Sequence, residues 1–101
     1  MGFVVGGMNA LSINSVEDYL CFLQSKGFQF QEDARGFIYF GKQYANATDE
    51  LVNTAIELTL KAQKKFDGSF YVSLLEMFVE NKIETRHEAI EFIKEKDILA
   101  L

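Results

Sequence analysis

The chain of 101 residues contains no proline and no tryptophan, and it has one cysteine and one histidine. With Cys21 alone it can form neither an internal disulfide nor a zinc site with several cysteine ligands, which is typical of a reducing cytosol. With His87 alone it has no HExxH motif and no pair of histidines at metal-binding spacing. We expect Cys21 to be a small buried apolar side chain and His87 to be partly exposed.

Motifs for cofactor chemistry are also missing. The glycines form neither a dinucleotide-binding GxGxxG pattern nor a P-loop, so no phosphate-binding loop is indicated. Acidic residues are plentiful, but a catalytic pair of carboxylates needs a shared cleft, which the sequence does not define. We therefore expect no cofactor, no metal ion and no enzymatic activity.

Basic side chains are few. The formal net charge is −5, from 10 Lys and Arg against 15 Asp and Glu, and the only local concentration of basic residues is Lys61, Lys64 and Lys65. Because affinity for nucleic acids and for anionic membranes depends on clustered basic residues, this balance argues against both partners. We interpret the three lysines as a solvated helix face.

Long hydrophobic runs are absent as well. No stretch reaches the roughly 18 apolar residues that a membrane-spanning helix needs, and the N-terminal MGFVVGGMNAL lacks the basic region of a secretory signal. We therefore expect a cytoplasmic protein. The sequence from Met8 resembles a natural start, so residues 1–7 are expected to be a non-native or flexible extension. Since no linker composition occurs anywhere, we expect residues 1–101 to form a single domain.

Capping residues and apolar spacing predict four helices. Ser15 and Thr48 each precede a first turn with acidic residues, and Thr85 with Glu88 fits a capping box. With the apolar residues that follow at helical spacing, these signals predict helices over residues 16–26, 49–66, 70–81 and 86–96. The helix at 70–81, for which Ser69 is the expected cap, is apolar on nearly all sides, so we expect it to be the most buried.

The pattern changes between the first two of these helices. Phe28-Gln29-Phe30-Gln31 alternates with the two-residue period of a half-buried strand. Asp33-Ala34-Arg35-Gly36 is typical of a turn, and Phe37-Ile38-Tyr39-Phe40 resumes residues that favour strands. The sequence therefore predicts an antiparallel β-hairpin over residues 28–40 and an α+β fold in which this hairpin packs with about four helices.

The second predicted strand is apolar on both faces, which is more surface than the helices of one small domain cover easily. We therefore expect Phe37, Tyr39 and Phe40 to contact a partner. Two alternatives stay open for what covers them: the N-terminal Phe3-Val4-Val5 segment of the same chain, or another chain, which would give a homodimer through the hairpin.

Glu76, Glu80 and Glu84 are spaced by four and would form an acidic ridge on one continuous helix, aimed at a basic partner; two solvated helix faces are the alternative. Two functions fit these features. The first is a small non-enzymatic protein-interaction module, a bacterial or phage regulator or inhibitor that binds a protein through the hairpin and the acidic helices. The alternative is a helix-turn-helix-like DNA-binding regulator that uses residues 74–96, with Arg86 and His87 facing bases.

Overall fold

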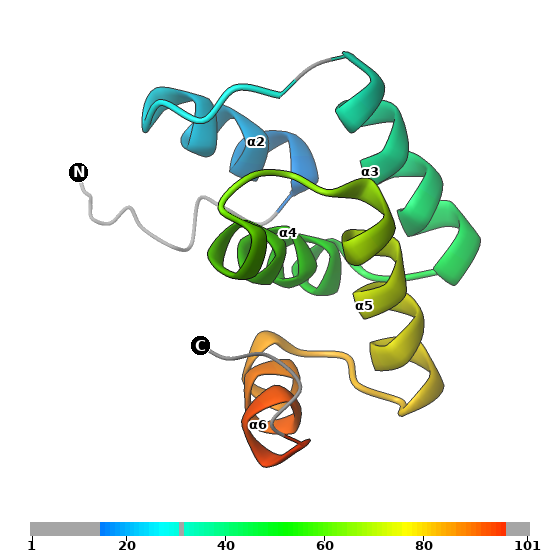
Figure 1. Ribbon diagram of the computed structural model, residues 1–101. Coiled ribbons are helices and arrows are strands. Elements are labelled where there is room, and N and C mark those ends of the chain that lie inside the picture. The colour runs from blue at the N-terminus through cyan, green and yellow to red at the C-terminus, as the bar shows by residue number, and fades with distance from the viewer. Residues whose placement is uncertain (1–14, 31, 97–101) are drawn as a thin grey trace, which may run out of the picture.

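The computed structural model describes residues 15–30 and 32–96, and these residues contain five α-helices and no strand (Figure 1). The helices are α2 (Val16–Ser25), α3 (Glu32–Ala45), α4 (Asp49–Gln63), α5 (Gly68–Glu80) and α6 (Arg86–Lys96). The prediction of an α+β fold is therefore wrong, since the described part of the chain is all-helical. The expectation for residues 1–7 falls outside the described residues.

Helix α4 lies at the centre of this arrangement and packs against α2, α3, α5 and α6 (Figure 1). It is buried around most of its circumference, including the polar residues Thr54 and Thr59. Their hydroxyls donate to the carbonyls of Glu50 and Ala55, at 2.9 and 2.7 Å, so burial leaves neither hydroxyl unsatisfied. The expectation that the helix at 70–81 is the most buried is wrong, because α4 holds that place.

The predicted caps are confirmed at three helix starts. Ser15 accepts a hydrogen bond from the backbone N–H of Asp18, Thr48 from that of Leu51, and Thr85 from that of Glu88. Two other boundaries differ from the prediction. Helix α4 ends at Gln63 because Lys64 adopts a left-handed conformation with φ of 66°. Helix α5 begins at Gly68 because Asp67, and not Ser69, accepts from the N–H of Phe70 at 3.1 Å.

The predicted hairpin over residues 28–40 is replaced by α3. Its inner side follows helical spacing, with Ala34, Ile38, Gly41 and Ala45 turned toward the rest of the chain and Ile38 fully buried. Neither glycine of α3 ends the helix. The alternation before it is only four residues long, and such short local preferences lose to tertiary packing, which here comes from α5.

Helices α3 and α5 run in the same direction and approach each other closely at two glycines (Figure 1). A Cβ on Gly41 would lie 2.8 Å from Cε2 of Tyr71, and a Cβ on Gly68 would lie 2.8 Å from Cγ of Phe37. The buried hydroxyl of Tyr71 donates to the carbonyl of Ile38 at 2.6 Å. An aromatic ring thus fills the space left by each glycine, which fixes the position of α3 along α5.

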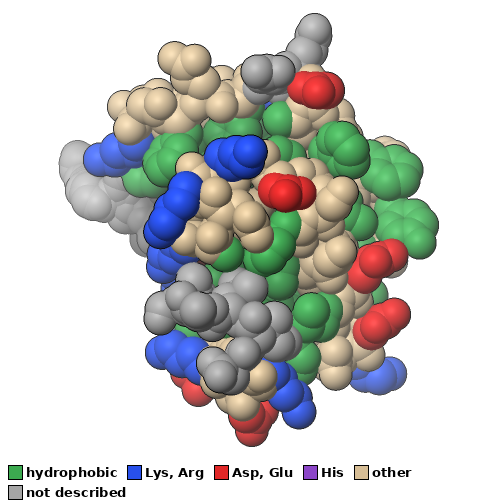
Figure 2. Space-filling view, in the orientation of Figure 1, with side chains coloured by type: hydrophobic (Ala, Val, Ile, Leu, Met, Phe, Trp, Pro, Cys, Tyr) green, Lys and Arg blue, Asp and Glu red, His purple; other side chains and the backbone are tan. Residues whose placement is uncertain are grey.

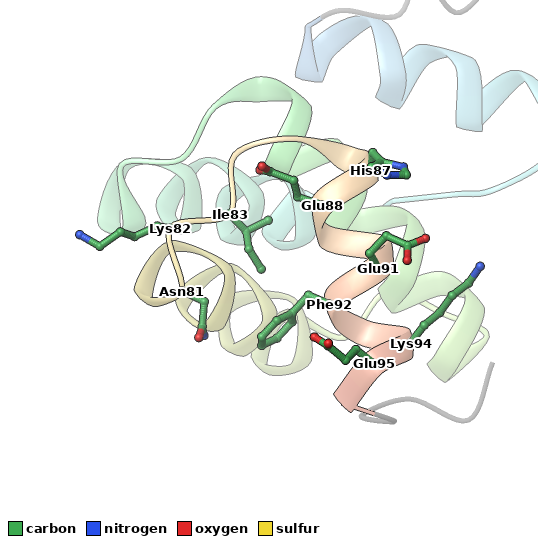
Figure 3. Close-up of a pocket in the computed structure, with 9 residues that line it drawn as sticks. All are labelled: Asn81, Lys82, Ile83, His87, Glu88, Glu91, Phe92, Lys94 and Glu95. Atoms are coloured by element: carbon green, nitrogen blue, oxygen red, sulfur yellow. The ribbon is translucent and has the colours of Figure 1, made fainter.

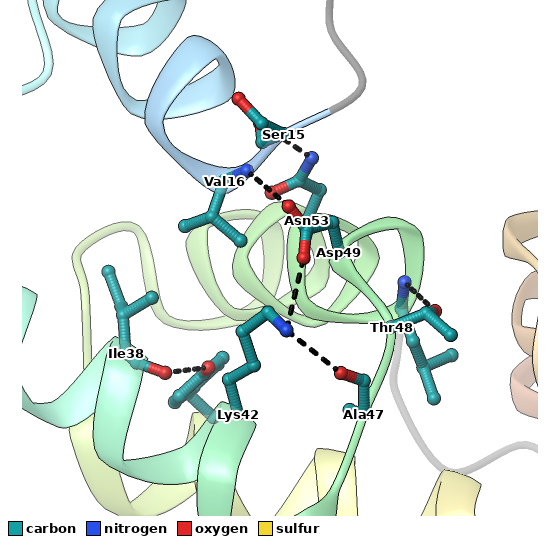
Figure 4. A network of polar contacts seen from close by, with 10 residues as sticks. Ser15, Val16, Ile38, Lys42, Ala47, Thr48, Asp49 and Asn53 are labelled. Carbon is teal, nitrogen blue, oxygen red and sulfur yellow. Dashed lines mark hydrogen bonds and ion pairs between the residues drawn. The ribbon is translucent and has the colours of Figure 1, made fainter.

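Asp49 joins the starts of α2 and α4 to the end of α3 (Figure 4). Its Oδ2 accepts from the backbone N–H of Val16 at 3.1 Å, and its Oδ1 lies 3.1 Å from Nζ of Lys42. Lys42 also donates to the carbonyl of Ala47 at 3.3 Å. Since the first N–H groups of a helix have no partner within the helix, Asp49 satisfies one that α2 would leave open.

Candidate functional site

Three aromatic side chains stand out on the surface of α3. Phe37, Phe40 and Tyr44 occupy positions i, i+3 and i+7 and are 45%, 57% and 62% exposed, respectively. The rings of Phe40 and Tyr44 stack with centroids 5.6 Å apart. We call these three residues the aromatic stripe. Figure 2 shows hydrophobic side chains gathered at the edge of the molecule formed by α3 and α5, with acidic side chains beside them.

Helix α5 extends this apolar surface. Leu75 contacts α3 at Gly41, and Val79 follows Leu75 by four residues, so Val79 lies on the same side of α5. It is 38% exposed. Because α3 and α5 are parallel, Val79 belongs to the end of the surface where Tyr44 lies.

The predicted surface residues are divided between two sides of α3. Phe37 and Phe40 belong to the aromatic stripe, whereas Tyr39 is half-buried and donates a hydrogen bond to Glu17 of α2. Arg35 also contacts Glu17, at 3.3 Å. Burial and the Glu17 contact raise the pKa of Tyr39 to about 12, and the hydrogen bonds from Tyr39 and Arg35 lower the pKa of Glu17. Tyr39 therefore connects α3 to α2 and is not part of the candidate surface.

Tyr44 was missed by the sequence analysis. Its signal is the spacing from Phe37 and Phe40, which has meaning only on a helix.

The three predicted glutamates do not form one ridge. Glu76 and Glu80 lie one turn apart on α5; Glu76 is half-buried and Glu80 is exposed. Neither takes part in any of the four ion pairs among the described residues. Glu84 follows the end of α5, and its backbone N–H donates to Oε1 of Glu88 at 3.0 Å. That bond, together with the contacts of Glu88 to Thr85, lowers the pKa of Glu88. Of the three glutamates, Glu76 and Glu80 thus lie on α5, the helix that contributes Val79 to the apolar surface.

A shallow hollow of about 740 Å³ lies between the end of α5 and α6, lined in part by Ile83, His87, Glu91 and Phe92 (Figure 3). Phe92 points toward α5, where its ring packs edge-on against Phe78, while His87 points away from it. His87 is exposed in the first turn of α6. The lining therefore has no convergent set of buried polar groups that would orient a substrate.

A smaller hollow of about 370 Å³ lies where α3 begins, between Phe30, Phe37 and Phe66. Asp33 and Lys65 also line it and are both exposed. Phe37 thus belongs both to this hollow and to the aromatic stripe. The apolar surface therefore continues from the stripe to Phe30 and Phe66, beyond the N-terminal end of α3.

Arg86, at the start of α6, is bound by two carboxylates of α4. Its Nε and Nη2 donate to the two carboxylate oxygens of Glu57 at 3.0 and 2.7 Å, and its backbone N–H donates to Glu50 at 2.7 Å. The hydrogen bonds to Glu57 raise the pKa of Arg86. Burial alone would raise the pKa of Glu57, but the contacts with Arg86 and Lys61 outweigh burial and lower it. The helix-turn-helix alternative stays a prediction that these contacts do not favour.

Chemistry-bearing side chains do not gather elsewhere in the described part of the chain. Cys21 is exposed on α2, so the expectation that it is buried is wrong. Within residues 15–30 and 32–96, no three His, Cys, Asp or Glu side chains are placed to hold a metal ion. Over the same ranges, no helix has the length and hydrophobicity needed to cross a membrane.

Searches of curated proteins and of solved structures found no match to the chain. One family model matches residues 11–99, which include all five described helices, and it is described as a family of unknown function (DUF6123). The chain therefore belongs to the DUF6123 family.

Proposed function

We propose that the protein is a small non-enzymatic interaction module that regulates a partner protein by binding one of its helices along the aromatic stripe. The observation that carries this proposal is the exposure of Phe37, Phe40 and Tyr44 on one side of a single helix. Anchors at i, i+3 and i+7 are the spacing at which helices dock in grooves. Aromatic side chains are also the residues that most often dominate binding energy at protein interfaces.

The size of the patch supports a protein partner. At roughly 200 Å² for each fully exposed ring, the aromatic stripe presents about 300 Å² of mostly apolar surface. The largest apolar patch on a typical monomeric protein is about 300–600 Å², and such patches are often functional. Burial of this surface against a partner would remove apolar area from water and so favour binding.

The charge around the patch indicates what the partner carries. Glu76 and Glu80 have no cation beside them among the described ion pairs. They favour a partner that has a basic side chain beside one end of its bound apolar helix. Together with the net charge of −5, they disfavour nucleic acid. We place the protein in the cytoplasm, where an exposed thiol such as Cys21 stays reduced.

Site-specific photo-crosslinking in the cells that produce the protein tests this proposal. A benzophenone amino acid replaces Phe40 or Tyr44, and replaces Phe22 of α2 as the control, because Phe22 is also a partly exposed aromatic residue. We expect nuclease-resistant protein adducts from positions 40 and 44 and none from position 22. Glu76→Lys with Glu80→Lys should reduce their yield. Absence of adducts at both test positions, or equal yield at position 22, would refute the proposal.

A further inference from the structure

No contact within the described part of the chain requires a glycine at position 36. Gly36 is exposed within α3, and a Cβ built on it would meet no atom within 4 Å, unlike the Cβ positions at Gly41 and Gly68. A glycine inside a helix is less stable than an alanine, so such a position needs a reason. Close approach by a group from outside the chain supplies one.

Gly36 lies one turn before Phe40, on the side of α3 that carries the aromatic stripe. Each copy of the chain therefore presents a protruding ring and a gap about one turn away. We infer that the helix bound by the aromatic stripe is α3 of a second copy, packed antiparallel about a two-fold axis between Gly36 and Phe40. Each Phe40 ring then covers Gly36 of the other copy. This inference rests on the proposed function, since it names the partner.

Lys65 supplies a charge complementary to Glu76 and Glu80 in this arrangement, although Asp33 lines the same hollow as Lys65. Lys65 lines the hollow beside Phe37, at one end of the stripe. Glu76 and Glu80 follow Leu75 along α5, which runs parallel to α3, so they lie toward the other end. None of these three charges has an ion-pair partner among the described residues. Antiparallel pairing brings Lys65 of one copy toward the two glutamates of the other.

The same pairing also matches polar groups within α3. The two-fold axis lies midway between residues 36 and 40 of α3. The midpoint of residues 33 and 44 lies within half a residue of the same point, so these two residues also face each other across the axis. The exposed carboxylate of Asp33 therefore lies opposite the exposed hydroxyl of Tyr44 of the other copy. A parallel pairing would instead place Lys65 beside Lys65 and the two glutamates beside those of the other copy, which is unfavourable.

The area sets the expected strength of this dimer. The stripe offers about 300 Å² per copy, whereas a standard interface buries about 800 Å² per partner. Even with the neighbouring residues of α5, the interface lies at the small end of the range. We therefore expect a dimer with a micromolar dissociation constant, which separates on dilution.

Sedimentation equilibrium over a dilution series tests the dimer. We expect Phe40→Asp to give monomers at all concentrations, and Gly36→Ala to weaken the dimer by about tenfold because its methyl group holds the ring away. Phe22→Asp, which changes a partly exposed aromatic residue on α2, is the matched control and should leave the dissociation constant unchanged. Circular dichroism confirms that each variant is folded, and Gly36→Ala is expected to be more stable, so its weaker dimer cannot be a folding defect.

Engineered cysteines test the antiparallel register in a Cys21→Ser background. A mixture of Asp33→Cys and Tyr44→Cys chains should form a disulfide-linked heterodimer. Each variant alone should not, because two-fold-related positions 33 are about 15 Å apart along the helices and positions 44 about 18 Å apart. Crosslinking of Asp33→Cys with itself would overturn the antiparallel arrangement.

A wild-type protein that is monomeric at its highest soluble concentration would overturn the dimer, as would a dimer unaffected by Phe40→Asp. The outcome for the proposed function is separate. Photo-adducts at position 40 with the mass of two chains support the dimer and the aromatic stripe as the binding surface. Adducts to a different protein, with a monomeric purified chain, overturn the dimer and leave the proposed function standing.

Discussion

Replacing Gly36 or Gly41 by alanine makes the same chemical change at two positions of α3, and we expect the two changes to shift stability in opposite directions. At Gly36 the added methyl group meets nothing within 4 Å. Alanine is favoured over glycine in a helix by about 0.5–1 kcal/mol, so Gly36→Ala should raise the free energy of unfolding by that amount. For a chain of this size, this raises Tm by roughly 4 °C.

At Gly41 the same helix preference is outweighed by a clash. The new Cβ would lie 2.8 Å from Cε2 and 3.3 Å from Cζ of Tyr71, and 3.2 Å from Cδ1 of Leu75. Tyr71 cannot move aside easily, since it is fully buried and its hydroxyl binds the carbonyl of Ile38. Overpacking of this kind costs about 1–3 kcal/mol, which leaves Gly41→Ala destabilised by roughly 1 kcal/mol, and by at most about 2.5 kcal/mol, after the helix gain.

Urea unfolding followed by circular dichroism at 222 nm measures both effects. The protein concentration must lie well below the dissociation constant of the dimer, because dimer formation itself adds to apparent stability. If Gly41→Ala is as stable as the wild type, the close contact between α3 and α5 is wrong. If Gly36→Ala is less stable than the wild type under these conditions, Gly36 has a role within the chain and its assignment to an interface fails.

Three further predictions concern other contacts. Tyr71→Phe removes the buried hydrogen bond to Ile38 and should lower the free energy of unfolding by about 1 kcal/mol in urea titration; an unchanged value would contradict the bond. The lowered pKa of Glu57 means that its pair with Arg86 stabilises the fold above pH 4.5 and is lost as the pH falls through the lower folded value. Arg86→Ala should therefore cost up to about 1 kcal/mol at neutral pH and flatten the acid decline in stability measured by urea unfolding. Cys21 should react with a maleimide in the native protein as fast as in urea, and protection in the native state would contradict its exposure.

Local signals in the sequence were sufficient where local contacts decide the structure. The caps at Ser15, Thr48 and Thr85 act within one helical turn, so their side chains identify the helix starts directly. The range 28–40 could not be assigned in this way. Its helix depends on Gly41 fitting against Tyr71, some 30 residues later in the chain, and no local preference reports that fit.

The candidate site was predictable in part for the same reason. Excess apolar surface at Phe37 and Phe40 follows from composition alone, whichever secondary structure carries it. Which neighbouring residues share that surface depends on whether the segment is a strand or a helix, because the side-chain repeat is 2 residues in a strand and 3.6 in a helix. A strand turns alternate residues to one face and would group Phe37 with Tyr39, whereas a helix groups Phe37 with Phe40 and Tyr44 and turns Tyr39 toward Glu17.

The packing of α3 also explains why its surface, and not its core, carries the large rings. Gly41 brings the backbone of α3 close to Tyr71 and Leu75, so little space for large side chains remains along the contact with α5. Phe40 and Tyr44 lie outside that contact, and beyond their mutual stacking, worth about 0.2–0.5 kcal/mol for such a pair, they add little to the fold.

Phe40→Gln with Tyr44→Gln should therefore change the free energy of unfolding of the monomer by no more than about 0.5 kcal/mol. The same variant should lose dimerisation in sedimentation equilibrium, because it removes most of the exposed apolar area of the stripe. A large loss of stability would instead mean that the two rings support the fold. Two rings that the fold does not need, exposed beside a glycine that the helix does not need, indicate a surface adapted to an external contact.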